Sequence, residues 1–125
     1  MPEVEKMIKK FDIPEEIVKE SLNILETTSK TGKIRKGTNE VTKAIERKKA
    51  LLVYIAEDVN PPEIVMHLPI LCEESKINYT FVPTKEALGI AAGLKVGSAS
   101  IAIVDAGEAK QSLKGLDNKI TELRK

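Results

Sequence analysis

Three short segments constrain the fold of this chain more than any other feature of its sequence. Residues 50–56 (ALLVYIA), 78–82 (NYTFV) and 99–105 (ASIAIVD) have the length of strands, and the first and third are almost continuously apolar. Such runs are typical of strands buried on both faces of a sheet. Between them lie stretches whose apolar residues recur at helical spacing. Alternating strands and helices predict an α/β fold with helices on both faces of a small sheet.

Turn and capping residues set the expected ends of the remaining elements. Thr38 and Thr84 are expected to be N-caps, because their hydroxyls can accept from the first backbone N–H groups of a helix. The segment GKIRKG, bounded by two glycines, predicts an edge strand, and Pro69 is expected to kink its helix. The stem of Lys48 is expected to complete the inner face of the second helix. The pattern predicts helices over residues 14–29, 38–48, 85–94 and 107–124, and one that begins at 60–63.

The length and composition indicate a single domain, residues 1–125, with an ordinary hydrophobic content of 42%. The single cysteine, Cys72, excludes an internal disulfide framework and a multi-cysteine zinc site. Aromatic residues make up only 3%, which counts against a protein that stacks bases on an aromatic sheet. There is no long apolar run and no signal peptide pattern, so the protein is expected to be cytoplasmic and free of membranes.

The charge of this chain is concentrated in one segment. The formal net charge is only +1, yet residues 30–49 contain eight basic and two acidic side chains, a net charge of +6. A neutral total with one basic segment predicts a local site for an anion rather than a uniformly basic surface. The alternative is a solvated, lysine-rich helix face.

The segment IRKGTNEVTK places polar and charged residues at the start of a predicted helix. Asn39, Glu40 and Lys43 share a helix face, because residues three and four apart are neighbours. A helix N-terminus beside Arg35 and Lys36 attracts phosphate, whereas Glu40 repels it. A carboxylate has a use there if it faces donors, such as the imino and amino N–H groups of guanine. The residues therefore predict a base-recognition cluster, the alternative being an exposed amphipathic helix with a polar first turn.

The other chemically reactive side chains favour structural roles. His67 is the only histidine and lies near an apolar helix face, and Cys72 continues that face without an obvious base partner. No Gly-rich phosphate loop or dinucleotide fingerprint is present. We therefore expect a protein that is not an enzyme and has no catalytic residues, cofactor or metal. The alternative is a small α/β ligand-binding domain or enzyme that uses the basic helix start for a phosphorylated small molecule.

The motifs KGTNEVTKAIE, VYIAEDVNPPEIVMHLPILCEE and ALGIAAGLKVG occur in this order along the chain. Together they resemble the kink-turn-binding ribosomal protein family, and the similarity extends from about Ile13 to about Thr121. The chain especially resembles the archaeal large-subunit members, which also form the RNA-binding core of box C/D and H/ACA guide ribonucleoproteins and occur in ribonuclease P. The resemblance implies a three-layer α/β/α sandwich around a four-stranded mixed sheet.

The resemblance also implies which residues bind RNA. The family's G-x-N-E-x-x-K pattern is present as Gly37, Asn39, Glu40 and Lys43, which in the family contact the tandem sheared G·A pairs of a kink-turn. Ile64 matches a position that packs on a flipped-out nucleotide, and a facing loop clamps that nucleotide. The implied RNA-binding residues are Lys33, Lys36, Gly37, Thr38, Asn39, Glu40, Lys43, Ile64, Lys85, Leu94, Lys95, Val96 and Ala99.

The partners implied by the resemblance are kink-turn RNAs and the proteins that assemble on them. The RNAs are ribosomal RNA, box C/D and H/ACA guide RNAs and ribonuclease P RNA, and guide ribonucleoprotein proteins dock on the bent RNA. The protein alone is expected to be a monomer. Some relatives have Arg-Pro where this chain has Val96-Gly97, so its facing loop is expected to be more flexible and apolar. This departure favours the archaeal members, which accept both kink-turns and kink-loops.

Overall fold

The structure of the chain, a computed structural model, describes residues 14–59 and 63–124, with the side chains of residues 63, 64, 123 and 124 left out. One four-stranded sheet lies at its centre, with the strands in the order β1-β4-β2-β3. Strand β4 is antiparallel to β1 and β2, whereas β2 and β3 are parallel, so the sheet is mixed. The strands are β1 (Lys33–Lys36), β2 (Leu52–Ala56), β3 (Asn78–Val82) and β4 (Ser100–Asp105).

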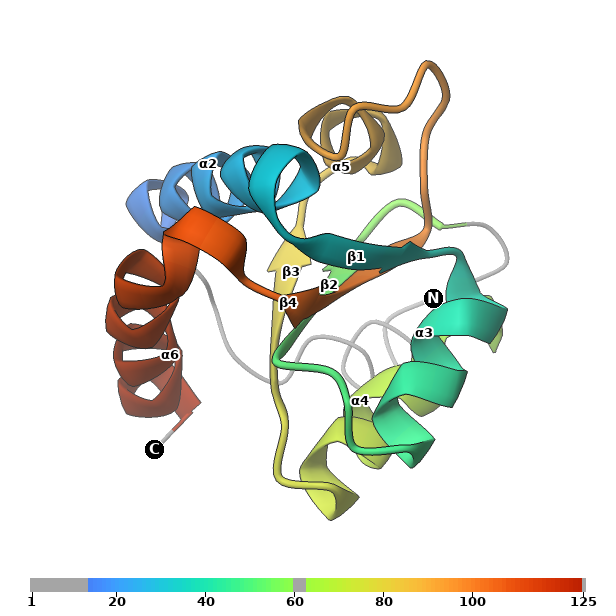
Figure 1. The fold of residues 1–125 in the computed structure, drawn as a ribbon. Coiled ribbons are helices and arrows are strands. Elements are labelled where there is room, and N and C mark those ends of the chain that lie inside the picture. The colour runs from blue at the N-terminus through green and yellow to red at the C-terminus, as the bar shows by residue number, and fades with distance from the viewer. Residues whose placement is uncertain (1–13, 60–62, 125) are drawn as a thin grey trace.

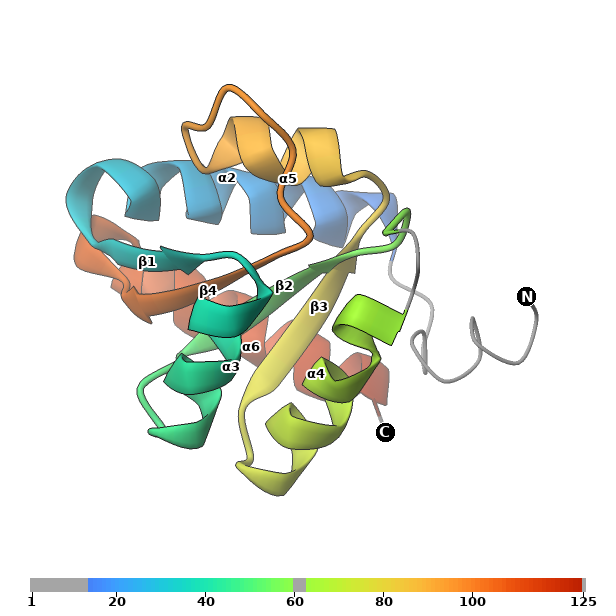
Figure 2. The same ribbon diagram turned by 90° about the vertical axis from the view of Figure 1, so that its right-hand side faces the viewer.

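Helices cover both faces of this sheet, so the predicted three-layer α/β/α sandwich is confirmed. Helices α2 and α5 lie over one face and α3 and α4 over the other, as Figure 2 shows, while α6 packs against α2 and β3. The helices are α2 (Glu15–Thr31), α3 (Thr38–Glu46), α4 (Glu63–Glu74), α5 (Lys85–Ala91) and α6 (Lys110–Arg124), with a short 3₁₀ turn η1 (Gly107–Ala109) before α6.

The core lies on the two central strands. Every residue of β2 is buried, as its continuous apolar sequence predicts, and the first four residues of β4 are buried as well. Tyr54 of β2 is also buried, and its hydroxyl donates to the Ser21 carbonyl of α2 (2.6 Å). Burial raises the pKa of Tyr54, and the charge of Asp117 raises it further, so the phenol keeps the proton that it donates.

The observed ends of the elements differ from the predicted ones at several places. Lys48 is exposed and has a left-handed backbone (φ 57°) after α3 has ended, so its expected place on the inner face of that helix is wrong. Helix α5 ends at Ala91 rather than at residue 94, and the last helix begins with the η1 turn. Helix α4 continues through Pro69. The predicted edge strand is β1, and β3 has the predicted bounds.

The sheet topology brings several chain segments to one edge. Strands β1 and β2 are both antiparallel to β4, and β3 runs parallel to β2. The ends of β1, β2 and β3 therefore lie at the same edge of the sheet as the start of β4. Helices α3, α4 and α5 follow these three strands, and the loop of residues 92–99 precedes β4. In Figure 1 the start of α3 lies at the right of the sheet, and α5 and this loop lie above the sheet.

Candidate nucleic-acid interface

A glycine forms the turn between β1 and α3. Gly37 has φ +91°, a conformation that side-chain-bearing residues rarely adopt, although the space around its Cα is open. Its N–H donates to the Ser100 carbonyl at the start of β4 (3.1 Å). Gly37 is the N-cap of α3, so the predicted cap at Thr38 is wrong. The Thr38 hydroxyl instead lies 3.3 Å from the Ser100 hydroxyl, and both contacts fix the start of α3 against β4.

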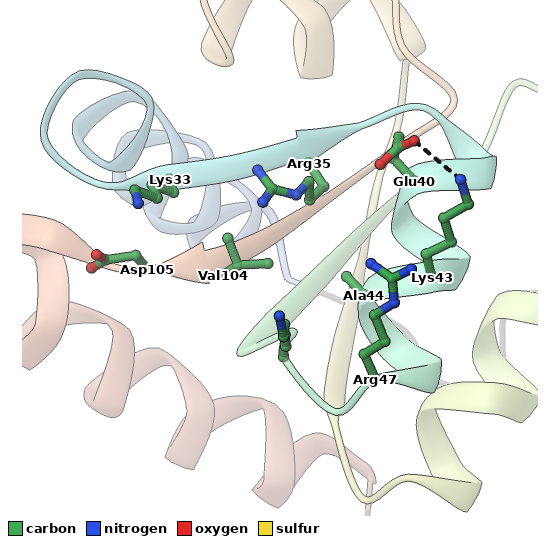
Figure 3. Close-up of a pocket in the computed structure, with 9 residues that line it drawn as sticks. Lys33, Arg35, Glu40, Lys43, Ala44, Arg47, Val104 and Asp105 are labelled. Atoms are coloured by element: carbon green, nitrogen blue, oxygen red, sulfur yellow. Dashed lines mark ion pairs between the residues drawn. The ribbon is translucent and has the colours of Figure 1, made fainter.

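The predicted base-recognition cluster lies on the exposed side of α3. Asn39, Glu40 and Lys43 are all exposed, whereas Val41, Ala44 and Ile45 of the same helix are buried. The Glu40 carboxylate and the Lys43 ammonium form an ion pair at 3.6 Å, which is drawn in Figure 3. The side chains of Glu40 and Lys43 remain 54% and 57% exposed, so both groups are accessible to a ligand.

A basic hollow of about 450 Å³ adjoins this cluster, between β1 and α3. Lys33 and Arg35 line it from β1, since alternate residues of a strand share a face. Five cations and two carboxylates take part in its lining, so positive charge dominates it. The residues lining this basic hollow are Lys33, Arg35, Glu40, Lys43, Ala44, Arg47, Lys49, Val104 and Asp105 (Figure 3).

Part of this hollow was not predicted from the sequence. Arg35 was predicted as a cation near the helix start, but neither Arg47 nor Lys49 was among the predicted RNA-binding residues. The available signals were the net charge of residues 30–49 and the position of Arg47 four residues after Lys43. Lys36, in contrast, is exposed at the end of β1 but is not among the residues that line the hollow.

The loop between α5 and β4, residues 92–99, presents an apolar tip. Val96 is 72% exposed and Lys95 is also exposed, whereas Leu94 and Ala99 are partly buried against the core. The Leu94 N–H donates to the Gly89 carbonyl (2.9 Å), so the loop is held at its start. Of the predicted loop residues, the structure therefore places Lys95 and Val96 where a ligand can reach them most directly.

Lys85 holds the other end of the same loop. Its carbonyl accepts from the Ser98 N–H (3.0 Å), and its own N–H donates to the Asp58 carboxylate (2.8 Å). The Lys85 side chain is exposed at the start of α5, which Thr84 caps as predicted by accepting from the Ala87 N–H (3.1 Å). Lys85 therefore lies at the same edge of the sheet as the start of α3, and its predicted contact with RNA stays a prediction.

Comparisons with known proteins decide the family. The model of the Ribosomal protein L7Ae/L30e/S12e/Gadd45 family matches residues 19–113. The chain belongs to this family. Among solved structures, it is similar to a 15.5 kD RNA binding protein of Giardia lamblia, with a TM-score of 0.86 and 33% sequence identity. That similarity covers 94% of this chain and 97% of the Giardia chain, which confirms the resemblance and the fold that it implied.

Within this member of the L7Ae/L30e/S12e/Gadd45 family, Ile64 belongs to the first turn of α4. Its side chain lies outside the described part of the structure, so its predicted contact with a nucleotide stays a prediction. Cys72, further along α4, is buried as expected. In residues 14–59 and 63–124, no three His, Cys, Asp or Glu side chains form a group that could hold a metal ion. None of the described helices has the length and apolar character needed to span a membrane.

His67 contacts the helix that carries the base-recognition cluster. Its Nε2 lies 2.9 Å from the Thr42 hydroxyl of α3, and the same hydroxyl donates to the Thr38 carbonyl (2.7 Å). This contact is of the structural kind expected for His67. Its partner was not predicted, because Thr42 lies 25 residues earlier in the chain.

Proposed function

We propose that this protein binds RNA and catalyses no reaction. Its membership of a ribosomal protein family and its similarity to the Giardia RNA binding protein support this function. The observation that carries the proposal is the arrangement at the start of α3. There Asn39, Glu40 and Lys43 are exposed beside a hollow in which cations outnumber carboxylates.

More specifically, we propose that the RNA carries a kink-turn or kink-loop, and that Glu40 contacts guanine in its sheared G·A pairs. A carboxylate in a basic site weakens phosphate binding, so the site is not built for phosphate alone. Glu40 can accept from the imino and amino N–H groups of guanine, while Asn39 can both donate to and accept from a base edge. The cations that line the hollow would meanwhile contact the phosphates of the adjoining stem.

The exposed tip of the loop completes this proposed interface from the other side. Val96 offers an apolar surface, and Lys95 and Lys85 add positive charge near it. An unpaired, flipped-out nucleotide needs an apolar contact for its base and a cation for its phosphate, and the loop offers both. In this division, α3 contacts paired bases, the basic hollow contacts the stem, and the loop contacts the unpaired nucleotide together with Ile64.

The proposed mechanism is selection of a bent RNA. A free kink-turn RNA interconverts between open and kinked forms, and a protein that binds only the kinked form shifts the population toward it. The size of the shift is set by the difference in affinity for the two forms. The contacts of Gly37 and Thr38 with Ser100 support this mechanism, because they hold the start of α3 against β4 in the protein alone.

We also propose the particles in which this function operates. The same surface would recognise kink-turns in ribosomal RNA, in box C/D and H/ACA guide RNAs and in ribonuclease P RNA, because the motif rather than its surroundings is contacted. Proteins of the guide particles would then dock on the bent RNA. Such a protein acts as a monomeric, cytoplasmic scaffold.

A titration with two RNAs tests the proposed function. One RNA contains a kink-turn with tandem G·A pairs, and the other is a duplex of equal length in which Watson–Crick pairs replace the bulge and the G·A pairs. The proposal predicts a dissociation constant for the kink-turn RNA at least about a hundredfold lower, since specific nucleic-acid sites commonly exceed non-specific ones by this factor or more. Equal binding of the two RNAs would contradict it and would indicate simple attraction of phosphate by the cations.

A further inference from the structure

A continuous set of polar contacts links the elements that form the proposed interface. His67 of α4 contacts the Thr42 hydroxyl of α3 (2.9 Å), which contacts the Thr38 carbonyl (2.7 Å). The Thr38 hydroxyl lies 3.3 Å from the Ser100 hydroxyl at the start of β4. The Ser100 carbonyl in turn accepts from the hydroxyl of Ser98, at the end of the loop (3.0 Å). We call this set the polar brace.

The direction of the hydrogen bonds at Thr42 follows from its single hydroxyl proton. The Thr38 carbonyl can only accept, so the Thr42 hydroxyl donates to it at 2.7 Å. The Thr42 oxygen must then accept at its other contact, and the His67 Nε2–H donates to it. A neutral His67 therefore carries its proton on Nε2, and a cationic His67 donates in the same way.

The polar brace lies mostly away from water. Ser100 is fully buried, Ser98 is 8% exposed, and the side chains of Thr38, Thr42 and His67 are partly buried. Hydrogen bonds in such surroundings are stronger than at the surface and costly to break. They are also directional, so they fix the rotation of α3 about its axis as well as its distance from α4. They add to the apolar packing of Val41, Ala44 and Ile45, which turns the same face of α3 toward the core.

We propose that His67 and Thr42 are positioning residues for RNA recognition. This inference rests on the proposed function. The brace passes through Thr38, which directly precedes Asn39 and Glu40 in α3, so a small rotation of the first turn of α3 would displace both base-contacting side chains together. Sites that contact bases at hydrogen-bond distance depend on such support, because a displacement of about 1 Å breaks the contact. His67 thus acts on RNA through α3, without touching it.

Matched variants of Thr42 test this proposal. Thr42→Val has nearly the same shape but no hydroxyl, whereas Thr42→Ser keeps the hydroxyl. Thr42→Val loses the contact with His67 and the hydrogen bond to the Thr38 carbonyl, and it should weaken binding of the kink-turn RNA about fivefold to tenfold. It should leave the affinity for the straight duplex of equal length unchanged, because phosphate contacts tolerate a small rotation. Thr42→Ser should bind both RNAs within about twofold of the wild type.

Variants of His67 test the same contact from the other side. His67→Gln places an amide donor near the position of Nε2 and should preserve the affinity for the kink-turn RNA. His67→Leu has no donor and should weaken it as well, by no more than Thr42→Val does, because Thr42→Val also removes the hydrogen bond to the Thr38 carbonyl. The double variant with Thr42→Val and His67→Leu should bind no more weakly than Thr42→Val alone, since the contact that His67→Leu removes is already lost in Thr42→Val.

The outcomes separate this inference from the proposed function. Thermal unfolding of each variant first confirms that the protein is folded at the temperature of the titration. If the wild type prefers the kink-turn RNA but folded Thr42→Val binds it equally well, the positioning role is wrong and the proposed function stands. If Thr42→Val weakens the binding of both RNAs by the same factor, the brace does not act on base recognition specifically, and the inference is again wrong. A wild type without preference for the kink-turn overturns both.

Discussion

Replacing Glu40 with glutamine perturbs the proposed contact with guanine while keeping the shape of the side chain. The Glu40 side chain is 54% exposed, and its carboxylate forms an ion pair with Lys43 at 3.6 Å. Exposed pairs of this kind contribute only about 0.2–1 kcal/mol, so Glu40→Gln should change the stability of the protein very little. A loss of RNA affinity can then be attributed to the interface itself.

The expected loss depends on the RNA. On a kink-turn RNA, Glu40→Gln should cost about 1–3 kcal/mol, the usual value of one good base contact. This corresponds to a dissociation constant roughly fivefold to 150-fold higher. On a straight duplex, the same change should leave binding equal or slightly tighter, because a negative charge near phosphates is gone and Lys43 no longer has its ion-pair partner.

The assay is a fluorescence titration of the wild type and of Glu40→Gln with both RNAs at one salt concentration. Glu46→Gln is the matched control, since Glu46 is also an exposed glutamate of α3 but lies at its end and outside the basic hollow. Opposite signs on the two RNAs would agree with base recognition by Glu40. If Glu40→Gln instead tightens binding to both RNAs by similar factors, Glu40 is only an acid that favours the N-terminus of α3, and the reasoning is refuted.

Four further predictions concern charge, packing and pH. With about four cations on phosphates, log affinity should fall with log salt concentration at a slope of roughly −3 to −4, and a slope near zero would exclude such contacts. Arg47→Ala should make that slope shallower by about one unit and should weaken the binding of all RNAs by a similar factor. Lys114→Ala, an exposed control on α6, should change neither the slope nor the affinity in the same titrations. Ile64→Ala should weaken binding of the kink-turn RNA with little change in melting temperature, and a large drop in melting temperature at equal affinity would identify Ile64 as a core residue. Burial raises the pKa of Asp117 in the folded protein, so the ionised carboxylate destabilises the fold as pH rises through that pKa. Asp117→Asn should therefore raise the melting temperature at pH 7 but not at pH 3, and an equal rise at both pH values would contradict this cause.

Helix caps and strand ends were predictable from the sequence where they depend on residues close by in the chain. The cap at Thr84 and the bounds of β3 agree with the prediction, because a hydroxyl three residues before a free N–H and a strongly β-favouring run act within a few residues. Thr38 has the same local signal as Thr84, yet its hydroxyl contacts Ser100, 62 residues later in the chain. Thr38 meets Ser100 because β1 pairs with β4. The local sequence around Thr38 does not show that pairing, so it could not predict this contact.

The candidate site was predictable in its charge but not in its shape. The net charge of residues 30–49 indicated an anion site, and helical spacing placed Glu40 and Lys43 on one exposed face. The basic hollow also needs Asp105 and Val104 from β4, and Lys49 from the segment after α3. Which of the cations at 47–49 face the hollow depends on the path of the chain after α3, where Lys48 has a left-handed backbone, so composition alone could not select Arg47 and Lys49 over Lys48.

The most direct test of the account is the shape of the RNA in the complex. A kink-turn RNA with a donor and an acceptor dye at the two stem ends reports the distance between them by energy transfer. At low salt without divalent ions, the free RNA should be mostly extended, and the wild-type protein should raise the transfer efficiency in a saturable manner as it selects the kinked form. Binding of the same RNA without any change in transfer efficiency would contradict the claim that this protein recognises a bent RNA.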